Sequence, residues 1–366
     1  MELVTFVRTP AGDEVVGMVL CAGLGTRLRP LTWQRPKPAV PVVGLPLLRY
    51  ALALLAGAGV QRAVVNAHHL AELTAETARE AARAVGLALR VSREPIIAGT
   101  GGALREARAE LEGARAIVLV NGDVLFDLDL GAALAAHAAS GALATMVVMP
   151  MPRGARYASV EADAALAVRR IAGFGPGGED LTPWHFTGVH VLSPRLIEEV
   201  PREPFEVDVN RQVYPPLLGA GLVQAHLATG YWNDLGAPHR YLAANLDLLS
   251  GRIPLGRFPG ADPFAGCRSP APGLFLGPGA KVASEATLLA PAYLGAGATV
   301  EPFASVGPSA VVGAGATVSS RARVARAVLW EGTSLAPGEE VVEAVAAGGL
   351  RLAASAEEGS PGPTRP

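Results

Sequence analysis

Cysteine and lysine are both scarce in this sequence of 366 residues. The two cysteines, Cys21 and Cys267, are too few for a disulfide framework, which favours a reduced, cytoplasmic location. Lysine occurs only at Lys37 and Lys281, so 29 of the 31 basic residues are arginine. A lysine in such a chain suggests a position where arginine does not serve.

An excess of charge of one sign is also lacking. The 31 basic residues face 33 acidic ones, and a net charge of −2 does not suggest a general polyanion binder, so we expect no nucleic-acid partner. Charged residues make up 17% of the chain and hydrophobic residues 50%, which is too apolar for a disordered protein. At roughly 150 residues per domain, the length predicts two or three domains.

Long apolar segments of the kind that enter membranes are missing as well. Residues 1–17 contain four charged side chains and lack the apolar core of a signal peptide. Residues 130–152 carry no Asp, Glu, Lys or Arg, but His137, Ser140 and Gly141 interrupt them. We predict a short helix, a turn and a buried strand there, and no membrane partner.

Residues 15–250 alternate short apolar runs with longer helical patterns. Strands are predicted at 15–21, 62–66, 87–91 and 116–120, and helices at 47–55, 69–84 and 102–111. Continuous buried strands that alternate with helices predict an α/β fold, a Rossmann-like and mostly parallel sheet covered on both faces. Ligands bind beyond the carboxyl ends of such strands, so the loops after Cys21 and Val120 are the expected sites of chemistry.

From Leu276 onward the sequence changes to a six-residue repeat. Bulky apolar residues recur at Leu276, Val282, Leu288, Leu294, Val300, Val306, Val312, Val318, Val324 and Trp330, and alanine follows each of the first eight by four positions. One bulky and one small inward residue in every six predict a β-solenoid. The pattern resembles the left-handed parallel β-helix of hexapeptide-repeat proteins, with three coils between 276 and 330.

The most informative stretch is Leu20-Cys-Ala-Gly-Leu-Gly-Thr-Arg-Leu-Arg-Pro-Leu-Thr-Trp-Gln-Arg-Pro-Lys-Pro38, directly after the first strand. Gly23 and Gly25 allow backbone N–H groups to turn toward phosphate oxygens. Arg27 and Lys37 add one forked and one compact cation, which suit a polyphosphate. The third glycine of a dinucleotide site and the Gly-Lys-Ser/Thr of a P-loop are both missing.

This stretch is similar to the signature of the sugar-1-phosphate nucleotidyltransferases. Four further segments resemble family motifs in the same order: Glu94-Pro-Ile-Ile-Ala-Gly-Thr-Gly-Gly-Ala-Leu104, Val120-Asn-Gly-Asp123, Phe186-Thr-Gly-Val-His-Val-Leu-Ser-Pro194 and Gly230-Tyr-Trp-Asn-Asp-Leu-Gly-Ala-Pro238. The resemblance covers residues 17–340. We therefore predict a tail at 1–16, a nucleotidyltransferase domain at 17–250, a linker at 251–275, a β-helix at 276–345 and a disordered tail at 346–366.

The resemblance implies a reaction between a nucleoside triphosphate and a sugar 1-phosphate that releases pyrophosphate. Asp123 and Asp234 are expected to hold Mg²⁺, Arg27 to contact the leaving pyrophosphate, and Lys37 the phosphates at the reacting centre. Arg27, Lys37 and Asp123 are the expected catalytic residues. The nucleotide-binding residues are expected to be Leu20, Ala22, Gly23, Gly25, Thr26, Arg27, Glu94, Gly99 and Gly102.

Substrate choice is less determined by the sequence. Glu94 stands where the family reads the base, and a carboxylate pairs best with two adjacent donors, which favours guanine and GTP. Uridylyl or thymidylyl transfer stays open, as do mannose, glucose and N-acetylmuramic acid 1-phosphates, with mannose 1-phosphate preferred. Many family members grip the sugar phosphate with a lysine, but this chain has none between 38 and 280. Thr187, Gly188, Arg169 and Arg170 are the predicted sugar-phosphate residues, with Arg153 as a further substitute.

Two other functions fit the sequence less well. An acyltransferase would need a histidine on the coils as base, but all seven histidines precede the solenoid. A non-catalytic nucleotide-sugar-binding subunit would not require Arg27, Lys37, Asp123 and Asp234 together. We also predict that an apolar flank of the β-helix mediates a homo-oligomer contact.

Overall fold

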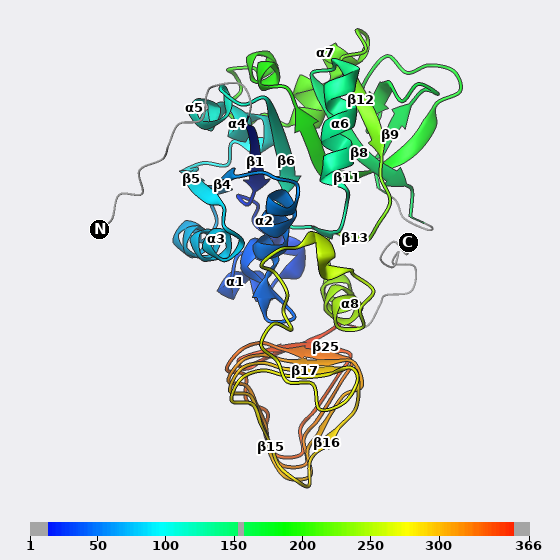
Figure 1. Cartoon of the computed structure of the whole chain (residues 1–366). Coiled ribbons are helices and arrows are strands. Elements are labelled where there is room, and N and C mark those ends of the chain that lie inside the picture. Colours follow the sequence, from blue (N-terminus) through cyan, green and yellow to red (C-terminus); the bar gives the residue numbers. More distant parts are fainter. Residues whose placement is uncertain (1–13, 153–156, 355–366) are drawn as a thin grey trace. The chain divides into compact units, whose positions relative to one another are not determined.

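The computed structural model describes residues 14–152 and 157–354, which form two compact units (Figure 1). The first unit contains the described part of Met1–Gly23 with Ala51–Gly122 and Leu128–Gly230, and the second contains Leu24–Tyr50, Asp123–Asp127 and the described part of Tyr231–Pro366. Residues 1–13 of the predicted N-terminal tail, Arg153, and residues 355–366 of the predicted C-terminal tail lie outside the described residues.

A nine-stranded mixed sheet organises the first unit. Its main path runs β10-β9-β11-β6-β1-β4-β5, while β8 pairs with β11 and β12. Strands β6, β1, β4 and β5 are parallel, with β5 at the edge, and β11 joins β6 antiparallel. The strands are β1 Val15–Leu20, β4 Arg62–Ala67, β5 Ala88–Arg93, β6 Ala116–Asn121, β8 Ala144–Pro150, β9 Ser159–Ala162, β10 Val168–Ile171, β11 Thr182–Leu192 and β12 Val223–Leu227.

Helices connect these strands, as the alternating pattern predicts. They are α3 Ala71–Val85, α4 Gly99–Glu106, α5 Arg108–Leu111, α6 Leu130–Ser140, α7 Pro215–Leu218, η3 Pro194–Glu199 and η4 Val209–Val213. Helix α2, Leu47–Gly57, begins in the second unit and ends in the first. Its Leu55 packs so closely on β1 that a Cβ at Gly17 would lie 2.7 Å from Leu55 Cδ1, which explains the glycine inside a buried strand. The predicted α/β fold is confirmed.

The loops expected to carry chemistry begin side by side. Leu20 at the end of β1 is in register with Asn121 at the end of β6, and Gly122 N–H donates to Leu20 O at 2.9 Å. A Cβ at Gly122 would lie 2.6 Å from Cys21 Sγ, so only glycine fits. The carboxyl ends of these two parallel strands therefore start both motif-bearing loops at one edge of the sheet.

The second unit combines the loop after β1 with the C-terminal strands. Its elements before the solenoid are η1 Thr26–Leu28, α1 Leu31–Gln34, η2 Lys37–Ala39, β2 Pro41–Val42, β3 Leu45–Pro46, β7 Leu125–Phe126, β13 Trp232–Asn233, α8 Pro238–Leu249 and η5 Leu255–Arg257. β7 and β13 form a short antiparallel pair, as do β2 and β3.

Three columns of short strands then form a solenoid, which is triangular when viewed along its axis (Figure 1). Within each column, neighbouring coils pair in parallel until the last strand, β26, which pairs antiparallel with β25. The strands are β14 Leu274–Leu276, β15 Lys281–Val282, β16 Thr287–Leu288, β17 Ala292–Leu294, β18 Thr299–Val300, β19 Ser305–Val306, β20 Ala310–Val312, β21 Thr317–Val318, β22 Arg323–Ala325, β23 Ala327–Leu329, β24 Glu340–Val342, β25 Ala344–Ala347 and β26 Leu350–Ala353.

The six-residue repeat correctly identifies most of the solenoid core. The core contains the predicted inward valines from Val300 to Val324 and the alanines that precede them by two positions. Trp330, the last predicted inward residue, does not belong to this core, and Leu329 takes the inward position instead. The reason is a shortened corner: Leu274 pairs with Ala292, eighteen residues on, but Ala310 pairs with Ala327, only seventeen on.

The solenoid also extends beyond the predicted end at residue 345. β25 runs to Ala347 and β26 to Ala353, inside the segment expected to be a tail.

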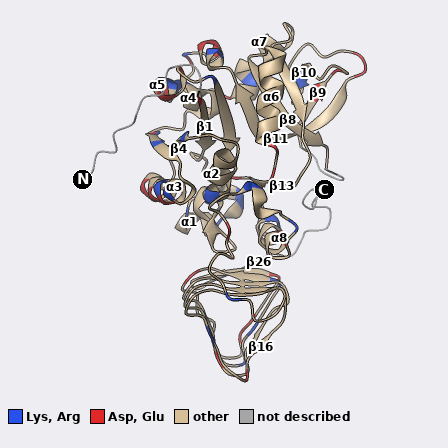
Figure 2. Cartoon of the chain, in the orientation of Figure 1, with Lys and Arg blue, Asp and Glu red and all other residues tan. Residues whose placement is uncertain are grey.

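Figure 2 shows few charged residues along the coils, in contrast to α3, where acidic and basic residues are interspersed. Within residues 14–152 and 157–354, no helix has the length and apolar character needed to cross a bilayer.

Candidate active site

The loop after β1 forms one wall of a small pocket within the second unit. The pocket has a volume of about 180 Å³ and is lined by Gly25, Thr26, Arg27, Leu28, Lys37, Asp123 and Gly236. Gly25 has a left-handed backbone (φ 61°), and its carbonyl accepts from Leu28 N–H at 3.1 Å and Thr32 Oγ1 at 2.8 Å. These bonds fix the turn that carries Thr26 and Arg27.

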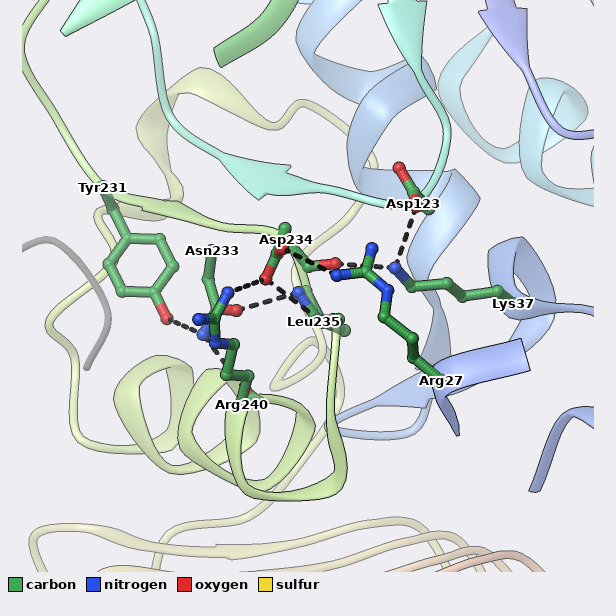
Figure 3. A network of polar contacts seen from close by, with 9 residues as sticks. Arg27, Lys37, Asp123, Tyr231, Asn233, Asp234, Leu235 and Arg240 are labelled. Carbon is green, nitrogen blue, oxygen red and sulfur yellow. Dashed lines mark hydrogen bonds and ion pairs between the residues drawn. The ribbon is translucent and has the colours of Figure 1, made fainter. Parts of the chain in front are cut away.

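Lys37 is the most constrained cation of this pocket. It lies in η2 and is 5% exposed, and its Nζ donates to Asp123 Oδ2 at 2.9 Å and to the Asp234 backbone oxygen at 2.6 Å (Figure 3). The ammonium therefore bridges the two acidic positions that the sequence predicts to act together. A compact point charge with several donors can do this from a nearly buried position, whereas a planar guanidinium is poorly shaped for it.

Asp234, directly after β13, is held by two hydrogen-bond donors and one longer ion pair. Its Oδ1 accepts from Arg240 at 2.7 Å and from Gly236 N–H at 3.1 Å, and its Oδ2 lies 3.7 Å from Arg27 (Figure 3). Burial would raise the pKa of Asp234, but the Arg240 hydrogen bond, with the charges of Arg240 and Lys37, outweighs burial, so the net pKa is lowered. Asp234 is therefore a carboxylate at neutral pH.

Gly236 makes room for this arrangement. A Cβ at Gly236 would lie 2.8 Å from both Arg27 Nη1 and Asp234 Oδ2. The Arg27 side chain is otherwise open, at 67% exposed. An exposed arginine tethered by one long ion pair can move to meet an anionic ligand at little cost.

A buried network fixes Asp234 from behind. Asn233 Oδ1 accepts from Leu235 N–H at 2.9 Å, while its Nδ2 donates to the Arg240 carbonyl at 3.1 Å and to Tyr231 Oη at 3.2 Å (Figure 3). Tyr231 Oη in turn donates to Asp247 Oδ2 at 3.0 Å. Asn233 thus holds the turn at Leu235 (φ 43°) that directly follows Asp234.

The predicted base loop lies in the first unit. Glu94 is 5% exposed and accepts from Asn66 Nδ2 at 2.7 Å and from Ala98 N–H at 3.0 Å. Gly99 and Gly102 are needed for close packing, since a Cβ would lie 2.5 Å from Val207 O or 2.9 Å from Ala98 Cβ, respectively. At the end of β1, Leu20 and Ala22 are partly or fully buried and Gly23 is exposed.

The predicted sugar-phosphate residues lie on two strands of the sheet, Arg169 and Arg170 on β10 and Thr187 and Gly188 on β11. Arg169 pairs with Asp163 and Arg170 with Glu161, at 2.9 and 2.8 Å, on the β9–β10 hairpin. Thr187 is buried and donates to Val147 O at 2.8 Å. Gly188 (φ 86°) occupies the irregularity between Phe186 and Val189 in the pairing of β11 with β8, and a Cβ there would lie 2.9 Å from Asn121 Nδ2.

Comparison with known proteins decides the family. A family model described as "Nucleotidyl transferase" matches residues 16–251. The chain belongs to this family.

Relatives of this nucleotidyltransferase differ in base and sugar. Mannose-1-phosphate guanylyltransferase from Mycobacterium tuberculosis is 31% identical over 247 residues, 67% of each chain. N-acetylmuramate alpha-1-phosphate uridylyltransferase from Caulobacter vibrioides is 35% identical over 239 residues, which cover 64% of this chain and 96% of the relative. UTP–glucose-1-phosphate uridylyltransferase from Synechocystis is 29% identical over 259 residues, 67% of this chain and 66% of the relative. The chain is therefore a nucleotidyltransferase of the sugar-1-phosphate type.

Four residues that adjoin or contact the predicted site residues were not identified from the sequence. Asn233 and Gly236 lie inside the quoted segment at 230–238, which was the available signal for them. Arg240 follows Asp234 by six residues in the first turns of α8, and Asn66 is a polar residue that is buried near the end of β4. The spacing in sequence does not indicate that Arg240 contacts Asp234, since the turn at Leu235 determines the distance between them.

Proposed function

We propose that this nucleotidyltransferase makes a nucleoside-diphosphate sugar and pyrophosphate from a nucleoside triphosphate and a hexose 1-phosphate, with GTP and mannose 1-phosphate as the preferred pair. The observation that carries the proposal is the Lys37 ammonium, bonded to Asp123 and to the Asp234 backbone beside a pocket formed by Gly25 to Leu28. The mannose-1-phosphate guanylyltransferases among the relatives support the choice of substrates. The uridylyltransferases support the alternative, UTP with glucose or N-acetylmuramic acid 1-phosphate.

The chemistry requires positioning more than proton transfer. An oxygen of the sugar phosphate forms a bond to the α-phosphorus, while the bond from the α-phosphorus to the β-phosphate bridging oxygen breaks and pyrophosphate leaves. The second pKa of a phosphate monoester is about 6, so the nucleophile is already ionised at neutral pH and needs no general base. The remaining task is to bring two polyanions together and stabilise charge at the α-phosphorus.

The residues of the pocket divide this task. Lys37, fixed and nearly buried, is proposed to contact the phosphates at the reacting centre. Arg27, exposed and loosely tethered, is proposed to follow the leaving pyrophosphate. Fixed donors in a water-poor site stabilise developing charge without reorganisation, and this is why the buried lysine is the more important of the two.

Mg²⁺ fits the chemistry of this pocket. Asp123, whose side chain is 39% exposed, meets the Lys37 ammonium through its carboxylate, and Asp234 meets the same ammonium through its backbone oxygen while its ionised carboxylate faces Arg240 and Arg27. In the described part of the chain no group of three or more His, Cys, Asp or Glu side chains is placed to hold a metal. Two carboxylates with substrate phosphates and water are the usual Mg²⁺ environment, and the bound ion would neutralise phosphate charge.

A substrate screen tests the proposal. Purified protein with Mg²⁺ is incubated with each of four nucleoside triphosphates and with mannose, glucose or N-acetylmuramic acid 1-phosphate, and pyrophosphate release and the nucleotide sugar are measured. We expect turnover with GTP and mannose 1-phosphate, its loss in Asp123→Asn, and its retention in Glu72→Gln, an exposed acidic control on α3. Tight nucleotide-sugar binding without turnover in any pair would refute the proposal.

The quaternary state stays a separate prediction. A homo-oligomer through the β-helix is expected to give a mass above that of one 37.5 kDa chain in light scattering at micromolar concentration. A monomer under those conditions would contradict it.

A further inference from the structure

Asn66 joins two loops of the first unit that are far apart in sequence. It lies in β4, in register with Leu20 of β1, and is 3% exposed. Its Oδ1 accepts from the N–H of Cys21 at 2.6 Å, and its Nδ2 donates to Glu94 Oε1 at 2.7 Å. The orientation of the amide is therefore fixed, since a backbone N–H requires the oxygen and a carboxylate requires the NH₂ group.

Glu94 continues the chain of hydrogen bonds into the next loop. Its second oxygen, Oε2, accepts from Ala98 N–H at 3.0 Å, directly before Gly99 begins α4. Its backbone is also fixed, because Glu94 N–H donates to Ala67 O at 2.8 Å and His68 Nδ1 lies 2.8 Å from Glu94 O. Each carboxylate oxygen thus already has a donor from the protein, and the side chain is almost completely enclosed.

This geometry is poorly suited to reading a base through the Glu94 side chain. A base reader must present both oxygens to two donors of the ligand, yet both oxygens of Glu94 point to Asn66 and Ala98. We propose that Glu94 and Asn66 are positioning residues: they act on the nucleotide through the backbone at Cys21 and Ala98, and the Glu94 carboxylate does not contact the base. The inference rests on the proposed function, because it assigns these two loops to the triphosphate substrate.

An exchange of the two functional groups distinguishes positioning from direct contact. Asn66→Asp places two carboxylates against each other, so both lack the donor that they need. Glu94→Gln places its NH₂ group against another donor, either Asn66 Nδ2 or Ala98 N–H, so one hydrogen bond is lost. The double variant combines Asn66→Asp with Glu94→Gln. Its new NH₂ group at position 94 donates to the new carboxylate at position 66, and the amide oxygen at position 94 accepts from Ala98 N–H. The carboxylate at position 66 still accepts from Cys21 N–H, so the double variant keeps the wild-type net charge and restores every hydrogen bond.

The readouts are the Kd of each triphosphate by calorimetry and the ratio of kcat/KM values between triphosphates. We expect each single substitution to weaken nucleotide binding about ten- to hundredfold, as for a buried unpaired polar group. The double variant is expected to return within about threefold of wild type and to keep the same base preference. A Glu94 that contacts the base predicts a double variant as weak as Glu94→Gln, or an altered preference, and either result would overturn the inference.

Folding and function are separated by two further measurements. Circular dichroism and thermal unfolding report whether each variant folds. If the single variants do not fold, the double variant alone tests the inference, because a folded double variant is expected to bind nucleotide like wild type. Calorimetry needs no turnover. Wild-type protein that binds a triphosphate but makes no nucleotide sugar would refute the proposed function and still allow this test, while wild-type protein that binds none would refute both.

Discussion

Substitution of Lys37 is the sharpest test of the proposed chemistry. Lys37→Met keeps the length of the side chain but removes the ammonium that bonds Asp123 Oδ2 and the Asp234 backbone oxygen. Lys37→Arg keeps the positive charge but replaces a compact group with a planar fork. Lys281→Met is the matched control, because it changes the only other lysine of the chain, an exposed residue of β15.

The expected magnitudes follow from burial and partners. Removing a fixed donor that stabilises the transition state typically lowers kcat by about 10²–10³-fold, or about 2.7–4 kcal/mol. Stability should fall by about 1–3 kcal/mol, since the Asp234 carbonyl loses its donor in a buried place. For Lys37→Arg the larger head has little room, because this position is only 5% exposed; overpacking costs about 1–3 kcal/mol and displaces the donor.

Steady-state pyrophosphate release, with the substrate pair found in the screen, provides kcat and KM for each variant. We expect Lys37→Met to lose at least about a hundredfold in kcat, Lys37→Arg at least about tenfold, and Lys281→Met less than about twofold. Chemical unfolding measures the accompanying loss of stability, which must be too small to unfold the protein at assay temperature. A Lys37→Met variant with kcat within about threefold of wild type would show that this ammonium does not stabilise the transition state.

Three further substitutions test other parts of the structure. Arg240→Met removes the hydrogen bond and charge that most strongly lower the pKa of Asp234, so this pKa should rise. A lowered pKa stabilises the folded protein at pH values above the unfolded value of about 3.9, and this stability is lost as pH falls through the folded value. Circular dichroism between about pH 2 and 6 should therefore show that the variant unfolds in acid at a higher pH than wild type. An unchanged midpoint would contradict this cause. Trp330→Phe removes the Nε1 donor to Tyr241 Oη at 2.9 Å and should cost about 0.5–1.5 kcal/mol in urea unfolding, whereas equal stability would mean that the bond contributes nothing. Burial lowers the pKa of His190 to about 3, so its neutral form stabilises the fold fully above about pH 6.5, and this stability declines by about 1.4 kcal/mol per pH unit as pH falls toward 3. His190→Gln should unfold with a flatter pH dependence between about pH 7.5 and 5, and parallel curves for the two proteins would exclude this explanation.

The sequence predicted the fold well wherever periodicity carries the information. The parallel strands, their order of appearance and the loops after β1 and β6 follow from apolar runs that alternate with helices. The solenoid follows from the six-residue repeat, because each inward valine and alanine must fit the same narrow core. The prediction fails at Trp330 because the last coil is one residue shorter, which moves the inward position to Leu329. The preceding repeats do not indicate this deletion.

For the site, the sequence identified residue types better than their partners. Lys37 was singled out by its rarity, and it is the side chain that connects Asp123 with Asp234. The partners of Glu94 were out of reach, because Asn66 lies 28 residues away and is brought near only by the pairing of β4 with β5. Arginines at 169 and 170 resembled free cations in sequence, but neighbouring carboxylates on their own hairpin bind them.

The end of the solenoid limits its own growth. At equivalent corners of successive coils stand Gly277, Gly295 and Gly313, where a Cβ would lie 2.5–2.7 Å from the backbone of the coil above, and the fourth member of this column is Trp330. The next coil contributes β25, whose Ala346 carbonyl accepts from Trp330 N–H at 2.8 Å, but the chain turns back after Ala347 into β26 instead of continuing into a further corner of the solenoid. Appending one more coil would require glycine in place of the tryptophan, and that exchange would detach the ring that Arg35 covers and Tyr241 binds. The tryptophan at this corner thus belongs to the attachment of the solenoid to α8, and a solenoid with glycine there would need a different attachment.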